Sequence, residues 1–228
     1  MWFAAGVGLL VLAAAGVYWS YEPGWRYPVR GVDVSHHQGN IDWRSLAADG
    51  TDFAYIKATE GGDWTDSMFI ENWQESDEAA VLRGAYHFYT LCTPGAEQAA
   101  HLIATVPNEE RMLPPAVDLE FGGNCSERPS VESFRTGFDR FLDRIHTHYR
   151  KTPVVYTNGT FYDHYLADDP PDVIWWIMSP IVEPLGEPQW TFWQHFPGPR
   201  DGVEGRIDRN AFKGDINALE ELTERELP

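Results

Sequence analysis

The sequence predicts a single α/β domain, a barrel of five β/α units followed by three plainer strands. Strand-like and helix-like segments alternate from Gly31 onward, as they do in proteins built on a parallel sheet. After residue 158 the connections are rich in Pro and Gly and too poor in helical pattern for full crossover helices. Eight strands in regular alternation can close and leave no exposed edge, which favours a barrel over an open sheet.

The eight strands are predicted from apolar and β-branched runs that are bounded by turn residues. They span residues 31–35, 53–58, 84–89, 116–121, 153–158, 173–178, 191–196 and 206–212. The clearest helix is predicted from Ser130 to Tyr149, because apolar residues recur there at spacings of three and four. These residues are Val131, Phe134, Phe138, Phe141, Leu142, Ile145 and Tyr149. Thr93 followed by Pro94 marks another helix start.

The N-terminal segment is predicted to be a hydrophobic helix outside this domain. Residues 1–21 carry no charged side chain and are long enough for a helix that crosses a bilayer. They fit a cleaved signal peptide or an uncleaved signal anchor, and we favour the anchor because the apolar run continues past residues 13–16. Arg26 and Arg30 follow the segment, the reverse of the usual charge bias for an exported C-terminal domain. We still expect export, either anchored on the periplasmic side of the cell envelope or secreted after cleavage.

The charge balance limits the partners of the chain. A formal net charge of −18 argues against nucleic acids and anionic membrane surfaces, which are bound by clusters of Lys and Arg. Contact with a membrane is therefore expected only through the N-terminal segment. Within this acidic chain, Lys57 and Glu60 in the stretch IKATEGG either frame a cleft or form a structural ion pair.

The two cysteines favour an oxidising compartment. Cys92 and Cys125 each lie a few residues beyond a predicted strand, so both can sit at the same end of a sheet. A disulfide between them would stabilise the fold by roughly 3 kcal/mol in the chain-entropy model, and it would persist only under oxidising conditions. The alternative is two unrelated buried thiols.

The stretch PPAVDLEFGGNC carries two acids on one face of a predicted strand. Asp118 and Glu120 are two residues apart, while apolar residues alternate with them on the other face. Like charges so placed raise the proton affinity of one member, which is how enzymes make an acid. Asp33 in the first strand and Asp208 in the last lie near strand ends that carry function in barrels. The four acids are predicted to converge, although each one alone could equally be a helix cap or an ion-pair partner.

The histidines beside Asp33 suggest a metal site of the kind found in barrel-type polysaccharide deacetylases. His36 and His37 are adjacent, however, and adjacent strand residues point to opposite faces, so both rings and Asp33 cannot readily share one metal. His146 and His148 are two apart on a helix and lie on different faces. No metal site is predicted, and we expect hydrogen-bonding or packing roles for these four histidines.

Seven motifs occur at the predicted strand positions and in a fixed order. They are GVDVSHHQGNIDW, FAYIKATEGG, GAYHF, PPAVDLE, PVVYTN, WQ and DRNAFKG. Together, from about Arg30 to Gly214, they resemble the glycoside hydrolase family 25 lysozymes, the muramidases of bacterial cell walls. The resemblance implies a (β/α)5β3 barrel of modified TIM type over residues 30–220. A linker at 22–29 precedes it and an acidic tail at 221–228 follows.

The resemblance also implies a reaction. The β-1,4 bond between N-acetylmuramic acid and N-acetylglucosamine in peptidoglycan would be hydrolysed without a metal or an organic cofactor. The family's general acid/base falls on Glu120 and its assisting carboxylate on Asp118, while Asp33 and Asp208 match the remaining active-site acids, with orienting or electrostatic roles. The family is regarded as retaining. Either Asp118 attacks the sugar or it assists the substrate's own acetamido group, and we favour the second.

Sugar binding is expected to use aromatic rings and a few fixed polar groups. The family-like segments place the candidates Tyr86, Tyr156, Trp176 and Gln194. The alternative is that these rings are ordinary barrel core, and Trp175 replaces Trp176 if the register shifts by one residue. Where family members continue the sixth strand into Ala and Tyr, this chain has Met-Ser-Pro at 178–180, which is a departure on that side of the cleft.

A second class of function is a catalytically inactive, membrane-tethered module that binds the cell wall. The presence of both Asp118 and Glu120 argues against it, because an inactive protein has no need of a desolvated acid pair. We therefore expect an active, monomeric hydrolase whose partner is the glycan strand of peptidoglycan.

Overall fold

The structure is a computed structural model that describes residues 26–225, so the apolar N-terminal segment lies outside the described residues. The strands are β1 (Arg30–Val34), β2 (Phe53–Glu60), β3 (Trp64–Thr65), β4 (Leu82–Phe88), β5 (Ala116–Leu119), β6 (Val154–Asn158), β7 (Ile174–Met178), β8 (Phe192–Gly198) and β9 (Ile207–Phe212). The helices are the 3-10 helix η2 (His36–Gln38), α2 (Trp43–Ala48), α3 (Phe69–Glu78), α4 (Gly95–Thr105), α5 (Val131–Tyr149), α6 (Gly159–Tyr165) and α7 (Ile216–Glu221). Within residues 26–225, every helix is too short or too polar to cross a membrane.

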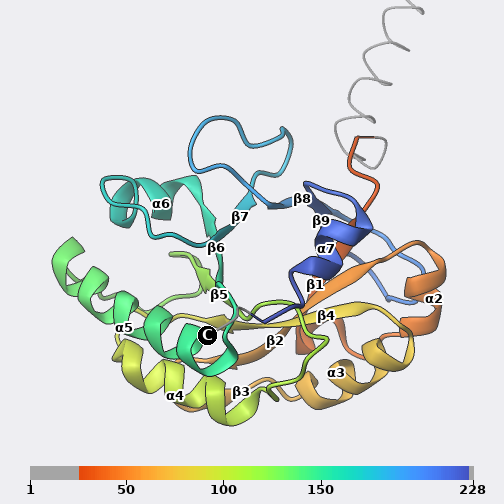
Figure 1. The fold of residues 1–228 in the computed structure, drawn as a ribbon, viewed down its shortest axis with the longest axis horizontal. Coiled ribbons are helices and arrows are strands. Elements are labelled where there is room, and N and C mark those ends of the chain that lie inside the picture. Colours follow the sequence, from red (N-terminus) through yellow and green to blue (C-terminus); the bar gives the residue numbers. More distant parts are fainter. Residues whose placement is uncertain (1–25, 226–228) are drawn as a thin grey trace, which may run out of the picture.

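Eight of the strands close into a barrel, which confirms the predicted fold class (Figure 1). Their order around the barrel is β1, β2, β4, β5, β6, β7, β8 and β9, and β9 pairs again with β1. β9 is antiparallel to both of its neighbours, while the other pairs in the barrel are parallel. β3 pairs antiparallel with β2 outside this ring. It was not predicted, because two residues carry no periodic pattern.

Five β/α units come first along the chain, as predicted. The helices α2, α3, α4, α5 and α6 follow β1, β2, β4, β5 and β6, and Figure 1 shows α3, α4 and α5 along one side of the sheet. α6 is short, and it begins where the side chain of Asn158 accepts a hydrogen bond from the backbone N–H of Phe161 at 3.1 Å. The connections between β7, β8 and β9 contain no helix.

The helix α5 begins one residue after Ser130, its predicted start, because Ser130 is the N-cap, with its hydroxyl accepting a hydrogen bond from the Ser133 N–H at 3.2 Å. The predicted apolar stripe is buried from Phe134 to Tyr149. Val131 is the exception, because it lies in the first turn, ahead of the packed part of the helix, and is 44% exposed.

The core has two layers, one between the sheet and the helices and one inside the barrel. The buried interior rings include Phe53, Tyr55, Trp176, Phe192 and Phe212. A Cβ atom at Gly84 would lie 2.4 Å from the Tyr55 ring, and one at Gly31 would lie 2.4 Å from the Phe53 ring. Glycine at these positions lets the aromatic rings fill the barrel. The interior is therefore a packed core, and space for a ligand is found at the rim.

The chain enters and leaves the barrel at neighbouring positions. Arg30 at the start of β1 pairs with Ala211 near the end of β9. Just ahead of β1, Val29 is buried, and the ring of Tyr27 meets Trp190 edge-on with their centroids 5.0 Å apart. Residues 26–29 therefore pack on the barrel.

Candidate active site

Four carboxyl groups line one cavity of about 310 Å³ at the rim where the parallel strands end. Asp33 of β1 and Asp208 of β9 stand directly opposite each other in the antiparallel pair. Asp118 lies in β5, and Glu120 follows that strand by one residue. The closed barrel thus brings together the four acids that the sequence places on three different strands.

Asp118 and Glu120, here called the acid pair, both have raised pKa values. The pKa of Asp118 lies well above its usual range, because of burial first and then the charges of Glu120 and Asp33, with Lys57 opposing. Burial also raises the pKa of Glu120, and the Lys57 charge again opposes the rise. Oδ1 of Asp118 is buried and has no hydrogen-bond partner in the protein. The acid pair therefore resists carrying two negative charges.

Asp33 is only 8% exposed, and its carboxylate is held by two amides. Burial raises the pKa of Asp33 to about 7, and the charge of Asp208 adds to this rise. Gln194 Nε2 opposes it by donating to both carboxylate oxygens, at 3.1 and 2.9 Å, and Asn210 Nδ2 donates to Oδ2 at 2.7 Å. Burial also raises the pKa of Asp208.

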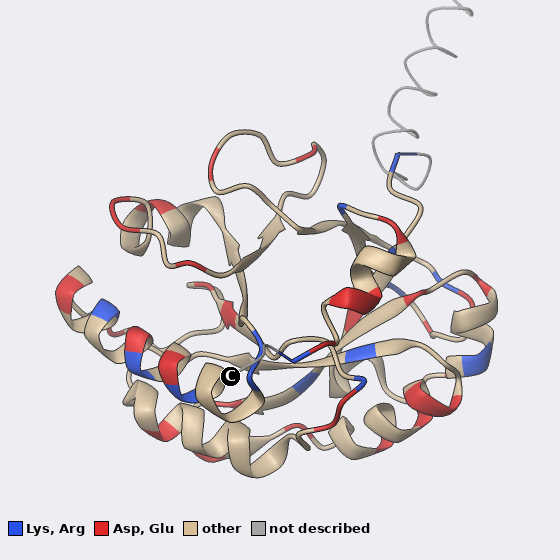
Figure 2. Ribbon diagram, viewed as in Figure 1, with Lys and Arg blue, Asp and Glu red and all other residues tan. Residues whose placement is uncertain are grey.

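Lys and Arg residues are scattered over the described chain (Figure 2). Lys57 is the cation whose charge acts on both members of the acid pair. Its Nζ lies 2.8 Å from Glu60 Oε2 and 5.0 Å from the ring centroids of Trp64 and Phe88. The predicted ion pair of Lys57 and Glu60 is therefore formed. Neither residue is among those that line the acid-lined cavity, but the Lys57 charge acts on both acids.

The side chains predicted to bind sugar all line the acid-lined cavity: Tyr86, Tyr156, Trp176 and Gln194. The hydroxyl of Tyr156 donates a hydrogen bond to Gln194 Oε1 at 2.8 Å. Trp176 is only 2% exposed and stacks on Tyr55, with ring centroids 4.9 Å apart. Its contact with a ligand is therefore limited to a small part of the indole.

The register of β7 is settled by its two tryptophans. Trp175 faces the helices, where its ring meets Tyr162 of α6, while Trp176 faces the cavity. Residues 178–180, where the chain departs from the family pattern, line a second cavity of about 480 Å³ beside α6. That cavity is also lined by the connection to β8, where Leu185 is 88% exposed. The departure therefore shapes a neighbouring groove rather than the acid-lined cavity.

Asn210 is a site residue that sequence reasoning missed. It stands two residues after Asp208 on β9, so both side chains share one face of the strand. That period of two was the signal that could have identified it. The cavity is also lined by residues of the turn after β1, which are Ser35, His37 and Gln38.

The histidines considered for a metal have other contacts. His36 Nδ1 lies 2.8 Å from Asp66 Oδ2, and the backbone N–H of His36 donates to the same oxygen. His37 lines the cavity, while His146 and His148 are exposed on α5. Among residues 26–225 there is no cluster of His, Cys, Asp or Glu arranged to hold a metal ion.

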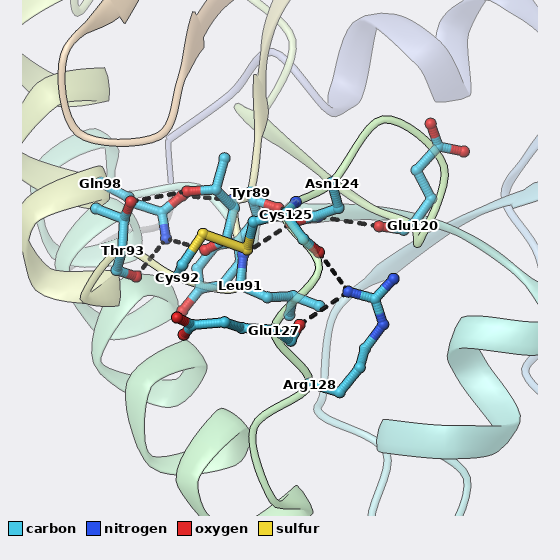
Figure 3. Close-up of a disulfide and its surroundings, with 11 residues drawn as sticks. Tyr89, Leu91, Cys92, Thr93, Gln98, Glu120, Asn124, Cys125, Glu127 and Arg128 are labelled. Atoms are coloured by element: carbon cyan, nitrogen blue, oxygen red, sulfur yellow. Dashed lines mark hydrogen bonds between the residues drawn. A yellow bond between two sulfur atoms is a disulfide. The ribbon is translucent and has the colours of Figure 1, made fainter.

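The loop that begins with Glu120 is fastened to the loop after β4 (Figure 3). Cys92 and Cys125 form a disulfide, with Cα atoms 6.4 Å apart, which confirms the predicted pairing. Asn124, which the sequence did not single out, donates from Nδ2 to the carbonyl oxygens of Glu120 at 3.0 Å and Tyr89 at 2.8 Å. The backbone position of Glu120 is therefore fixed from a neighbouring loop.

Comparison with known proteins identifies relatives over most of the chain. The family model described as "Glycosyl hydrolases family 25" matches residues 32–198. The chain is 35% identical over 205 residues to "Lysozyme M1" of Streptomyces globisporus, covering 84% of this chain and 70% of that protein.

Solved structures agree with this match. A family 25 glycosyl hydrolase from Bacillus anthracis superposes with a TM-score of 0.81 at 34% identity, covering 86% of this chain and 94% of that one. A bacterial lysozyme from Streptomyces coelicolor gives a TM-score of 0.77 at 32% identity, covering 86% and 96%.

Proposed function

Because the chain belongs to glycosyl hydrolases family 25, we propose that it hydrolyses the β-1,4 bond between N-acetylmuramic acid and N-acetylglucosamine in peptidoglycan. The proposal is supported by relatives named lysozyme and N,O-diacetylmuramidase. The observation that carries it is the cavity in which the acid pair, with both pKa values raised, faces Asp33 and Asp208.

Glu120 acts in this proposal as the general acid and then as the general base. Burial raises the pKa of Glu120, which favours the protonated carboxyl that the leaving glycosidic oxygen requires. When the bond between the anomeric carbon and that oxygen breaks, the proton moves to the oxygen and leaves Glu120 as a carboxylate. The carboxylate then takes a proton from the attacking water.

Asp118 assists the acetamido group of the substrate. Its carboxyl group lines the cavity and would accept a hydrogen bond from the acetamido N–H, while the acetamido oxygen bonds to the anomeric carbon as the leaving group departs. In the free site, burial favours the protonated form of Asp118, and a hydrogen bond from the substrate N–H favours the carboxylate. Substrate binding would thus shift the proton of the acid pair to Glu120 and leave the negative charge on Asp118. Water then opens the intermediate with overall retention.

The remaining cavity residues orient the reaction. Asp33 and Asp208 supply negative potential beside the forming cation, and the sugar-binding role is assigned to Tyr86, Tyr156, Trp176 and Gln194. Proton transfer and charge stabilisation come from carboxyl groups, so the proposed reaction needs neither a metal nor an organic cofactor. The disulfide supports action in an oxidising compartment outside the cytoplasm. We propose separately that the chain acts as a monomer.

Mass spectrometry of the fragments released from purified peptidoglycan tests the proposed function. We expect fragments with N-acetylmuramic acid at the reducing end, because the bond on that side of this sugar is cleaved. N-acetylglucosamine at the reducing end, or release of peptides alone, would contradict the proposal. Binding without any released fragment would support the alternative, an inactive wall-binding module.

Lys57 gives the proposed site a testable pH dependence. Lys57→Met is expected to move the profile of kcat/KM against pH to higher pH, because the pKa values of the acid pair lose the cation that holds them down. Glu60→Gln is the matched control, and it should move the profile the other way, because the Glu60 charge raises the pKa of Asp118. If both variants only lose stability and keep the wild-type profile, the ion pair is purely structural.

A further inference from the structure

The carboxylate of Asp33 is buried among neutral donors. Its hydrogen bonds come from the amides of Gln194 and Asn210, and the charges that shift its pKa are those of the acids Asp208 and Glu120. Two amides can satisfy a buried carboxylate without bringing a positive charge into the site. An arginine in their place would satisfy it as well, but would cancel its charge for the neighbouring acids.

The way the Asn210 amide faces is set by a third residue. An amide can turn over and exchange its donor and acceptor ends. The indole N–H of Trp176 can only donate, and it points at Asn210 Oδ1 from 2.8 Å. Turning the amide over would bring its NH₂ group against the indole N–H, so Nδ2 must stay directed at Asp33.

The indole itself cannot move away. Trp176 is 2% exposed and stacked on Tyr55, with an angle of 27° between the rings. On the other amide, the Tyr156 hydroxyl donates to Gln194 Oε1, which leaves Gln194 Nε2 for Asp33. A tyrosine hydroxyl can also accept a hydrogen bond, so Tyr156 fixes the Gln194 amide less strictly than the Trp176 indole fixes the Asn210 amide.

We propose that Asn210 and Gln194 are positioning residues that hold Asp33 as an oriented carboxylate. Trp176 enforces this arrangement, because its indole N–H keeps the NH₂ end of the Asn210 amide directed at Asp33. This chain of hydrogen bonds from Trp176 through Asn210 to Asp33, here called the lock, disfavours the protonated form of Asp33. A neutral Asp33 cannot donate its proton to Asn210, because Oδ1 of that amide is already used by Trp176 and cannot turn toward Asp33. The charges of Asp208 and Glu120 act in the opposite direction and raise the pKa of Asp33. Trp176 would thus serve the site mainly through Asn210.

The consequence for the reaction rests on the proposed function. The pKa of Asp33 is raised to about 7, and the two amides act against this rise. When Asp33 carries its negative charge, that charge raises the pKa of Asp118, so the lock favours a charge on Asp33 and a proton on Asp118. Neutral donors are required for this arrangement, because a cationic partner would remove the effect.

Trp176→Phe tests the lock, because it keeps an aromatic ring over Tyr55 but removes the indole donor. Without that donor the Asn210 amide can turn over and accept a proton from neutral Asp33, so the pKa of Asp33 should rise by about one unit. Asn210→Leu, which removes the amide, should raise it at least as far. The measurement is a carbon-13 NMR titration of the side-chain carboxyl groups, with Asp33→Asn to assign the Asp33 signal.

Tyr55→Phe is the matched control. It removes one buried hydrogen bond from the same interior, that of the Tyr55 hydroxyl to the Pro114 carbonyl, and leaves the Trp176 donor in place. It should leave the Asp33 titration at its wild-type position. An unshifted Asp33 signal in Trp176→Phe, or an equal shift in Tyr55→Phe, would overturn the proposal.

The titration does not depend on activity, so it separates this inference from the proposed function. If the proposed function also holds, the acidic limb of the profile of kcat/KM against pH should move to higher pH in Trp176→Phe, as the NMR titration of Asp33 does. A shifted titration with no hydrolysis of peptidoglycan by the wild-type protein would leave the lock standing and reject the function.

Discussion

Glu120→Gln is expected to slow hydrolysis of wall glycan by a factor of about 10² to 10⁴, the usual contribution of a positioned general acid. Gln has nearly the shape of Glu but holds no proton for the leaving oxygen. The fold should survive, because the loop is fastened through the Glu120 carbonyl, the disulfide and Asn124, none of which the change removes. Binding of glycan fragments should persist as well.

The measurement that isolates proton donation compares two substrates. With a glycoside whose leaving group departs without protonation, the first chemical step of Glu120→Gln should recover substantially. Glu132→Gln, the same chemical change in the exposed first turn of α5, is the matched control and should keep wild-type rates on both substrates. Near-full activity of Glu120→Gln on peptidoglycan would show that another group donates the proton.

Asp118→Asn should lower the rate by about 10² to 10³, the range found when an electrostatic stabiliser is removed. Its physical cause differs from that of Glu120→Gln. The change removes the negative charge that polarises the acetamido group and stabilises the positive charge formed at the anomeric carbon. That charge forms whatever the leaving group is, so the activated glycoside should not rescue this variant.

The contrast between the two variants decides the division of labour in the acid pair. Pre-steady-state rates on the activated glycoside should separate a recovered Glu120→Gln from a slow Asp118→Asn. Asp143→Asn, on the exposed face of α5, provides the matched carboxylate-to-amide control. Equal rescue of both site variants would show that the two acids do not have the roles proposed here.

The strands and the meeting of the four acids could be predicted because both follow from local pattern. Alternation with a period of two places Asp118 and Glu120 on one face, and barrel closure brings β1 and β9 together, so that Asp33 and Asp208 become neighbours. The disulfide could be predicted for the same reason, since both cysteines follow adjacent barrel strands.

The hydrogen-bond network around Asp33 could not be predicted in this way. It depends on the register of β9 against β8, which sets Asn210 opposite Gln194, and no local pattern gives that register. The side chain of Trp176 was placed on the correct face, but its partner is in another strand, so only the assembled barrel shows that its N–H is used by Asn210. The exposure of Val131 could not be predicted either, because periodicity does not show where along a helix the packing begins.

The pairing of Arg30 with Ala211 has a consequence for how the barrel can be held. Both ends of the barrel-forming chain lie at its base, while the acids lie at the opposite rim. A chain segment that tethers the barrel at either end would therefore attach to its base and leave the acid-lined cavity facing away from the point of attachment. If the apolar segment at residues 1–21 is retained in a membrane, the distance from the membrane to the acid-lined cavity would be set by the height of the barrel and by the few residues that join the segment to the barrel.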